Sequence, residues 1–148
     1  MKPKILFILH LPPPIHGAAM MGKYIQESEL VNSSFDCFCI NLATAGSLSD
    51  IGHISLKKLL KYFFLLKHIS HVVREIRPEL VYITPNAGGK AFFKDFIVVQ
   101  MLKSMGCKVI AHYHNKGVSV YQSKWVYNFF YKRFFSNFES NSVGRESL

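Results

Sequence analysis

Residues 4–10 of the chain read KILFILH, a short apolar run that is cut off by three prolines at 12–14. A continuous apolar run of this length is typical of a strand that is covered on both faces of a parallel sheet. Proline cannot continue a central strand, so a loop follows as far as Gly17. From residue 18 to about 31 the chain is rich in Ala, Met, Lys, Gln and Glu, which predicts a helix. The chain therefore opens as a strand followed by a helix.

The same alternation continues along the rest of the chain. After a break at 32–34, strands are expected at 35–42, 79–84 and 107–113, and helices at 55–76, with Ser55 as N-cap, 90–105 and 119–135. Strand and helix alternating four times predicts an α/β fold: a doubly wound, Rossmann-like parallel sheet of about four strands with helices on both faces. This domain is expected to cover 1–136, and 137–148 to form a polar, loose tail.

Composition limits the classes of function. The 148 residues are 49% hydrophobic and 18% charged, which excludes a disordered chain. A net charge of +9 favours anionic partners, among them phosphorylated ligands, nucleic acid and an acidic membrane. Three cysteines do not make a disulfide framework. The first apolar run is shorter than the ~7–15 residues of a signal peptide core, and no stretch reaches the ~18 apolar residues of a membrane span, so a cytoplasmic protein is expected.

Three loops follow the carboxyl ends of predicted strands, at 11–17, 85–89 and 114–117. In doubly wound sheets, ligands bind outside these ends. In the first loop, His16 and Gly17 precede a helix whose free backbone N–H groups suit a phosphate. Gly17 also allows a ligand to approach the backbone closely. The alternative is a rigid proline turn that needs glycine only for its backbone geometry.

The other two loops also allow both a ligand-binding and a purely structural interpretation. Asn86, Gly88 and Lys90 surround a tight bend that either receives a ligand or is simply a turn with a solvated lysine. His114 lies at the mouth of the fourth strand, where it can meet a hydroxyl or a phosphate. His112 is expected to lie deeper, packed and hydrogen-bonded.

Several chemistries lack their usual patterns. No zinc spacing surrounds the histidines of the fourth strand, so no metal is expected. The chain has no phosphate-binding P-loop, no dinucleotide fingerprint and no G-x-S-x-G elbow. None of its three aspartates (Asp36, Asp50, Asp95) or six glutamates forms a close carboxylate pair in a strand-end loop, so two-carboxylate hydrolysis is not expected. Recognisable nucleic-acid motifs are also missing, so nucleic acid is not an expected partner.

Two of the expected helices combine basic and aromatic residues. In the helix at 55–76, one face is expected to carry Leu56, Leu59, Leu60, Phe63, Leu66 and Val73, and another Lys57, Lys61, His68 and Glu75. The helix at 119–135 holds Trp125 and many Phe and Tyr residues beside Lys132 and Arg133. These aromatic residues either belong to the core or rest on an anionic membrane surface.

Three segments in this order resemble a known family. KILFILHLPPPIHGAA at 4–19, RPELVYI at 77–83 and KVIAHYH at 108–114 resemble the amino-terminal half of family 4 glycosyltransferases, which have the two-domain GT-B fold. The resemblance runs from about residue 4 to 136. It implies transfer of a sugar from a nucleotide-sugar donor to a glycan or lipid-linked acceptor, with retention at the anomeric carbon and without metal or cofactor.

The resemblance also assigns roles to residues. It implies that Gly17 approaches the donor diphosphate, with His16 beside it, and that His114 is the catalytic residue that points at the sugar or the acceptor. Asn86, Gly88 and Lys116 complete the expected substrate-binding set.

The resemblance covers only the acceptor side of the enzyme. A donor-binding domain is expected as a partner, and the chain is expected to be incomplete as an enzyme. Two alternatives stay open: a non-catalytic, flavodoxin-like module that binds phosphate or nucleotide, and a peripheral membrane adaptor.

Overall fold

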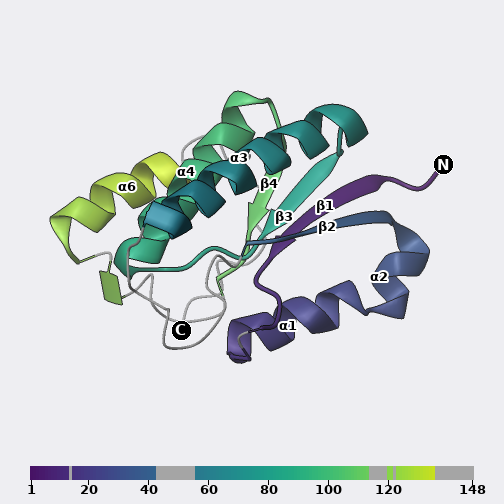
Figure 1. Cartoon of the computed structure of the whole chain (residues 1–148), viewed down its shortest axis with the longest axis horizontal. Coiled ribbons are helices and arrows are strands. Elements are labelled where there is room, and N and C mark those ends of the chain that lie inside the picture. The colour runs from purple at the N-terminus through teal and green to yellow at the C-terminus, as the bar shows by residue number, and fades with distance from the viewer. Residues whose placement is uncertain (14, 43–55, 114–119, 122, 136–148) are drawn as a thin grey trace, which may run out of the picture.

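The computed structural model describes residues 1–13, 15–42, 56–113, 120–121 and 123–135 (Figure 1). The elements are β1 (Lys4–Leu9), α1 (Gly17–Gln26), α2 (Glu29–Ser34), β2 (Asp36–Asn41), α3 (Leu56–Ile76), β3 (Leu80–Ile83), α4 (Gly89–Ser104), β4 (Val109–Ala111) and α6 (Trp125–Phe135). The expectations for Ser55 and for the tail at 137–148 lie outside the described residues. No described helix combines the length and the apolar character needed to cross a membrane.

The four strands form one parallel sheet in the order β2-β1-β3-β4, which confirms the predicted fold class. β1 lies inside the sheet, pairing Lys4 to Leu9 with β2 and Ile5 to Ile8 with β3. Strand order therefore reverses beside β1: the chain moves to β2 on one side of it and then crosses over to β3 on the other.

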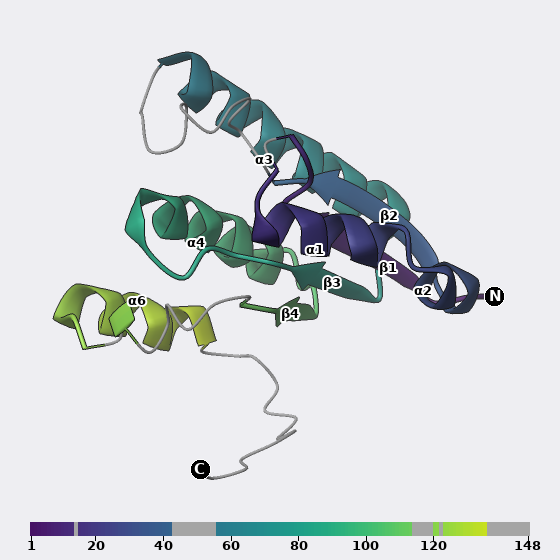
Figure 2. The ribbon, with the colours of Figure 1, turned by 90° about the horizontal axis from the view of Figure 1, so that it is seen from below.

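Helices cover both faces of the sheet (Figures 1 and 2). α3, α4 and α6 form a layer on one face, and α1 and α2 lie on the other. Leu6 and Ile8 of β1 belong to the core under the first layer, whereas Ile5, Phe7 and Leu9 belong to the core under α1 and α2. Because successive side chains point to opposite faces, both sets must be apolar. This explains why the first strand reads as an uninterrupted apolar run.

Two predicted helices differ from the structure. The one expected at 18–31 is two helices, because the Ser28 hydroxyl accepts a hydrogen bond from the Val31 backbone and caps the start of α2. The expected break at 32–34 is wrong, since these residues lie in α2. The helix expected at 119–135 is interrupted: residues 120–121 are helical, a turn follows at 123–124, and α6 begins at Trp125.

The face predicted for the helix at 55–76 is also partly wrong. Leu66 and Val73 do pack inward, against the sheet, together with Ile69. The other four predicted members point outward and are exposed: Leu56, Leu59, Leu60 and Phe63. The true inward stripe is set by Tyr62, Leu65 and Leu66 at the start of the helix. This segment is apolar on two sides, so helical spacing alone could not choose between them.

α1 packs so closely on the end of β1 that Gly22 admits no side chain. A Cβ atom built on Gly22 would stand 2.1 Å from the backbone carbonyl oxygen of His10, whereas one on Gly17 would meet nothing within 4 Å. Gly22→Ala should therefore lower the free energy of unfolding by about 2 kcal/mol, as overpacking does. Gly17→Ala on the same helix is the matched control and should leave stability within about 0.5 kcal/mol of wild type. Urea unfolding measures both, and equal stabilities would contradict this close packing.

Candidate site at the carboxyl edge of the sheet

The loops that follow β1 and β3 meet where strand order reverses. All strands are parallel, so their carboxyl ends lie along one side of the sheet, which we call the carboxyl edge. The helices that follow these two loops, α1 and α4, lie on opposite faces of the sheet (Figure 2), whereas the loops themselves begin at neighbouring strand ends. His10 follows β1 directly and Asn86 follows β3 after a short interval. The fold therefore brings the first two predicted loops together.

His16 and Gly17 form the start of α1. His16 is the N-cap, and its Nδ1 accepts a hydrogen bond of 3.3 Å from the Ala19 backbone. Gly17 is exposed, and the space beside its Cα is open. The side chain of His16 satisfies one of the free backbone N–H groups at the start of α1. The N–H groups of the first turn also give the amino-terminal end of the helix a partial positive charge. The geometry at Gly17 is thus compatible with the close approach of an anionic group.

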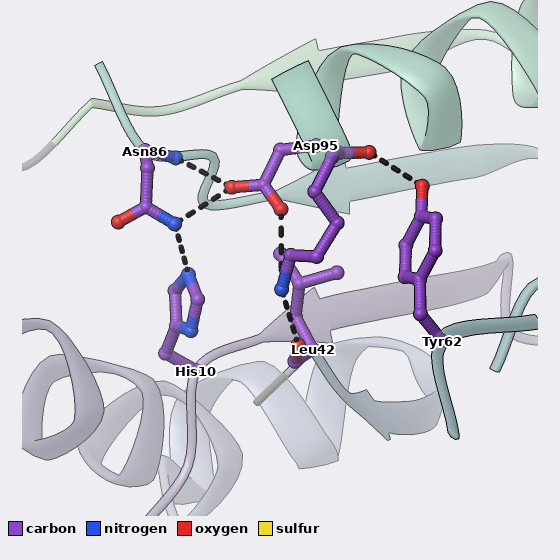
Figure 3. A network of polar contacts seen from close by, with 6 residues as sticks. His10, Leu42, Tyr62, Asn86 and Asp95 are labelled. Atoms are coloured by element: carbon purple, nitrogen blue, oxygen red, sulfur yellow. Dashed lines mark hydrogen bonds and ion pairs between the residues drawn. The ribbon is translucent and has the colours of Figure 1, made fainter. Parts of the chain in front are cut away.

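Asn86 is the centre of a polar network that links three strand ends (Figure 3). Its backbone N–H and its side-chain Nδ2 both donate to Asp95 Oδ2, at 2.8 and 2.7 Å. The same Nδ2 lies 3.1 Å from Nε2 of His10. Since an amide nitrogen can only donate, His10 Nε2 accepts, and the proton of a neutral His10 is on Nδ1. The network therefore fixes the tautomer of His10.

Asp95 and Lys94 anchor this network from α4. Asp95 is fully buried, and its Oδ1 lies 3.7 Å from Lys94 Nζ. Lys94 Nζ donates to the carbonyl oxygen of Leu42, just after β2, at 3.2 Å, and the Tyr62 hydroxyl of α3 donates to the Lys94 carbonyl oxygen at 2.6 Å. Burial raises the pKa of the Asp95 carboxyl, against the opposing effect of Lys94 and the Asn86 hydrogen bonds. One short stretch of α4 thus holds the ends of β2 and β3 in place.

The loop at 85–89 is supported by tyrosines from the end of the chain. The ring of Tyr121 fills the space beside Gly88, where a Cβ would stand 2.1 Å from a ring carbon. The Tyr127 hydroxyl accepts from the Gly89 backbone N–H at 3.1 Å, and the Tyr131 hydroxyl donates to the Ala87 carbonyl. Burial raises the pKa of Tyr131 to about 12, so this donor keeps its proton at neutral pH. Gly88 therefore has a packing reason to lack a side chain.

The remaining predicted residues divide into two groups. His114 and Lys116 lie outside the described residues. His112 lies on the sheet face that α1 and α2 cover in part, where its Nδ1 is hydrogen-bonded to the Tyr82 hydroxyl. The prediction of a hydrogen bond is confirmed for His112, but the predicted depth is wrong, because the residue is exposed. Among the described residues, no three His, Cys, Asp or Glu side chains are grouped closely enough to hold a metal ion.

Three members of the site are not among the residues predicted from the sequence: His10, Lys94 and Asp95. His10 offered a signal, since a polar residue directly follows a fully buried strand. Asp95 offered a weaker one, as an acidic residue among the apolar residues of the helix at 90–105. Asp95 is distant in sequence from His10, and only the packing of α4 against the sheet brings the two into one network.

No protein-family model, curated protein or solved structure matches the chain.

Proposed function

We propose that the chain is the acceptor-side half of a glycosyltransferase, which works with a donor-binding domain to transfer a sugar from a nucleotide sugar to a glycan or lipid-linked acceptor. The observation that carries the proposal is the meeting of the loops after β1 and β3. There the open backbone at Gly17, the capping His16 and the amide of Asn86 flank the place where a parallel sheet binds ligands. The resemblance to family 4 glycosyltransferases supplies the reaction.

The residues have distinct roles in this proposal. The start of α1 stabilises negative charge that grows on the departing diphosphate, because its N–H groups and its dipole are already oriented. Gly17 lets the diphosphate come near the backbone. His114 contacts the reacting sugar or the acceptor hydroxyl. Asp95 acts at a distance, by holding Asn86 and, through it, His10.

The test combines binding and transfer. The ¹⁵N-labelled chain is titrated with inorganic pyrophosphate, with nucleotide sugars and with a lipid-linked glycan in detergent. The amide signals of residues 16–19 and 86–88 should move with pyrophosphate and with the acceptor, and Gly17→Val should abolish the response. Lys23→Ala, at the exposed far end of the same helix, is the control. Radiolabelled sugar should then enter the lipid fraction only when a donor-side domain is added. Unmoved signals and no labelled lipid would contradict the proposal.

One observation favours a second candidate. The strand order β2-β1-β3-β4 is that of flavodoxin-like proteins, which bind a nucleotide cofactor at the reversal beside β1. A non-catalytic module of this kind should bind a free nucleotide tightly without the sugar. The acceptor half of a glycosyltransferase should respond to a free nucleotide weakly, and no more strongly than to pyrophosphate. Adding a free nucleotide to the same titration therefore separates the two candidates.

A further inference from the structure

α3 carries two apolar stripes, and the fold uses only one of them. The inner stripe packs on the sheet through residues such as Ile69 and Val73. The second, which we call the outer stripe, lies along the first half of the helix and points away from the sheet. Its members are between 51% and 74% exposed: Leu56, Leu59, Leu60, Phe63 and Phe64. A helix needs one apolar stripe to join a core, so the core formed by the described residues does not account for the outer stripe.

Along the first half of α3, the charged residues beside the outer stripe all have one sign. Lys57 and Lys61 border it, and Lys67 continues it with its Nζ 4.8 Å from the centre of the Phe63 ring. Residues 56–67 contain no Asp or Glu, and the first acidic residue of α3 is Glu75. A surface of Leu and Phe with a lysine border complements a layer that is apolar inside and negatively charged outside. An anionic lipid bilayer has this structure, with acyl chains for the apolar side chains and phosphates for the lysines.

The position of the outer stripe links it to the candidate site. α3 returns the chain from the end of β2 to the start of β3, so its first turns lie near the carboxyl edge. Tyr62, next to Phe63 in sequence, points inward and donates to the Lys94 carbonyl oxygen of the site network (Figure 3). The same turns of α3 thus contact the site with one side and expose the outer stripe on the other. At the start of α6, Trp125 and Phe129 are likewise 84% and 63% exposed.

We propose that the outer stripe docks the protein on an anionic membrane, with α3 lying in the plane of the lipid headgroups and the carboxyl edge close to the membrane surface. Docking goes beyond the proposed function and does not depend on it, because a surface of this chemistry binds lipid whether or not a sugar is transferred. For a glycosyltransferase, it brings the site to the height at which a lipid-linked acceptor presents its headgroup.

The experiment is co-sedimentation of the full chain with phosphatidylcholine vesicles that contain or lack phosphatidylglycerol. Binding should need the anionic lipid and should weaken strongly between about 0.1 M and about 1 M salt, as the Debye length falls from ~10 to ~3 Å. Replacing Lys57 and Lys61 together by Gln should reduce partitioning about 25-fold, since each lysine near such a surface contributes about fivefold. The triple variant Leu60→Ser, Phe63→Ser, Phe64→Ser should reduce it at least as much.

Matched controls lie on the opposite face of the sheet and away from the outer stripe. Tyr24→Ser with Leu30→Ser removes exposed apolar side chains from α1 and α2, and Lys23→Gln with Lys108→Gln removes two charges. Both controls should bind vesicles like wild type, and circular dichroism checks that every variant is folded. Equal binding to neutral vesicles, no binding to either kind, or equal losses in the controls would overturn the proposal. So would a wild-type dimer in sedimentation equilibrium that the triple serine variant converts to monomer, because a second copy would then cover the stripe.

Discussion

Phe92→Ala should lower the free energy of unfolding by about 4 kcal/mol, which is typical of a buried Phe cut back to Ala. Phe92 is fully buried at the start of α4. Its ring lies 5.0 Å from that of Tyr131 and 5.4 Å from that of Tyr127, measured between ring centres. Removing the ring leaves a cavity between α4 and α6 and ends several ring contacts, of which the one with Tyr131 is edge-to-face. Urea unfolding followed by circular dichroism gives the loss directly.

The control for this prediction is Phe129→Ala on α6. Phe129 is largely exposed, so the same chemical change should alter stability by only about 0.5 kcal/mol. Comparable losses at the two positions would show that α4 and α6 do not share a packed core. The loop at 85–89 depends on that core, because Tyr127 and Tyr131 hold it from α6.

Asp95→Ala should destabilise the fold by about 3 kcal/mol, because it leaves buried donors without their acceptor. The backbone and side-chain nitrogens of Asn86 both donate to Asp95 Oδ2, and Lys94 pairs with Oδ1. Glu75→Ala removes an exposed carboxylate from α3 and should change stability by about 0.5 kcal/mol or less. The free energy of unfolding in urea compares the two variants. A similar small effect at both positions would contradict the network of Figure 3.

Asp95→Asn tests the charge of the same residue through pH. Burial raises the pKa of Asp95 in the folded chain, so folding holds this proton more tightly than the unfolded chain does. The contribution of Asp95 to stability is therefore complete when the pH is below its pKa in the unfolded chain, about 3.9. It declines as the pH rises toward its pKa in the folded chain. Asparagine cannot titrate, so the free energy of unfolding of the variant should increase relative to that of wild type as the pH rises from acid to neutral. If the stability of the variant instead fell relative to wild type as the pH rose, the folded chain would favour the carboxylate over the protonated acid.

Part of the candidate site could be predicted because local signals mark it. His16 and Gly17 stand where a proline turn passes into a helix, and Asn86 stands two residues beyond a predicted strand. Their joint location follows from one rule, that parallel strands end at the same edge. The network behind them could not be predicted this way. Asp95 and Lys94 occupy positions in α4 whose direction depends on how that helix packs. Helical spacing does not show this direction, because the apolar residues of α4 are spread around the helix.

The outer stripe illustrates the same limit. Leu and Phe at helical spacing predicted an apolar face on α3, but the first half of the helix has two such faces. Contact with the sheet selected the one through Tyr62, Leu65 and Leu66, which left Leu60, Phe63 and Phe64 exposed.

The amino-acid sequence by itself determined the order of strands and helices, the parallel sheet and the burial of β1. These features depend on the spacing of apolar residues and on the positions of proline and glycine, which control backbone structure over a few neighbouring residues. Tertiary structure alone decided the strand order, the inward side of α3 and the link from His10 through Asn86 to Asp95. These features arise from contacts between residues far apart in the chain, and such contacts depend on which surfaces the packed layers bring together.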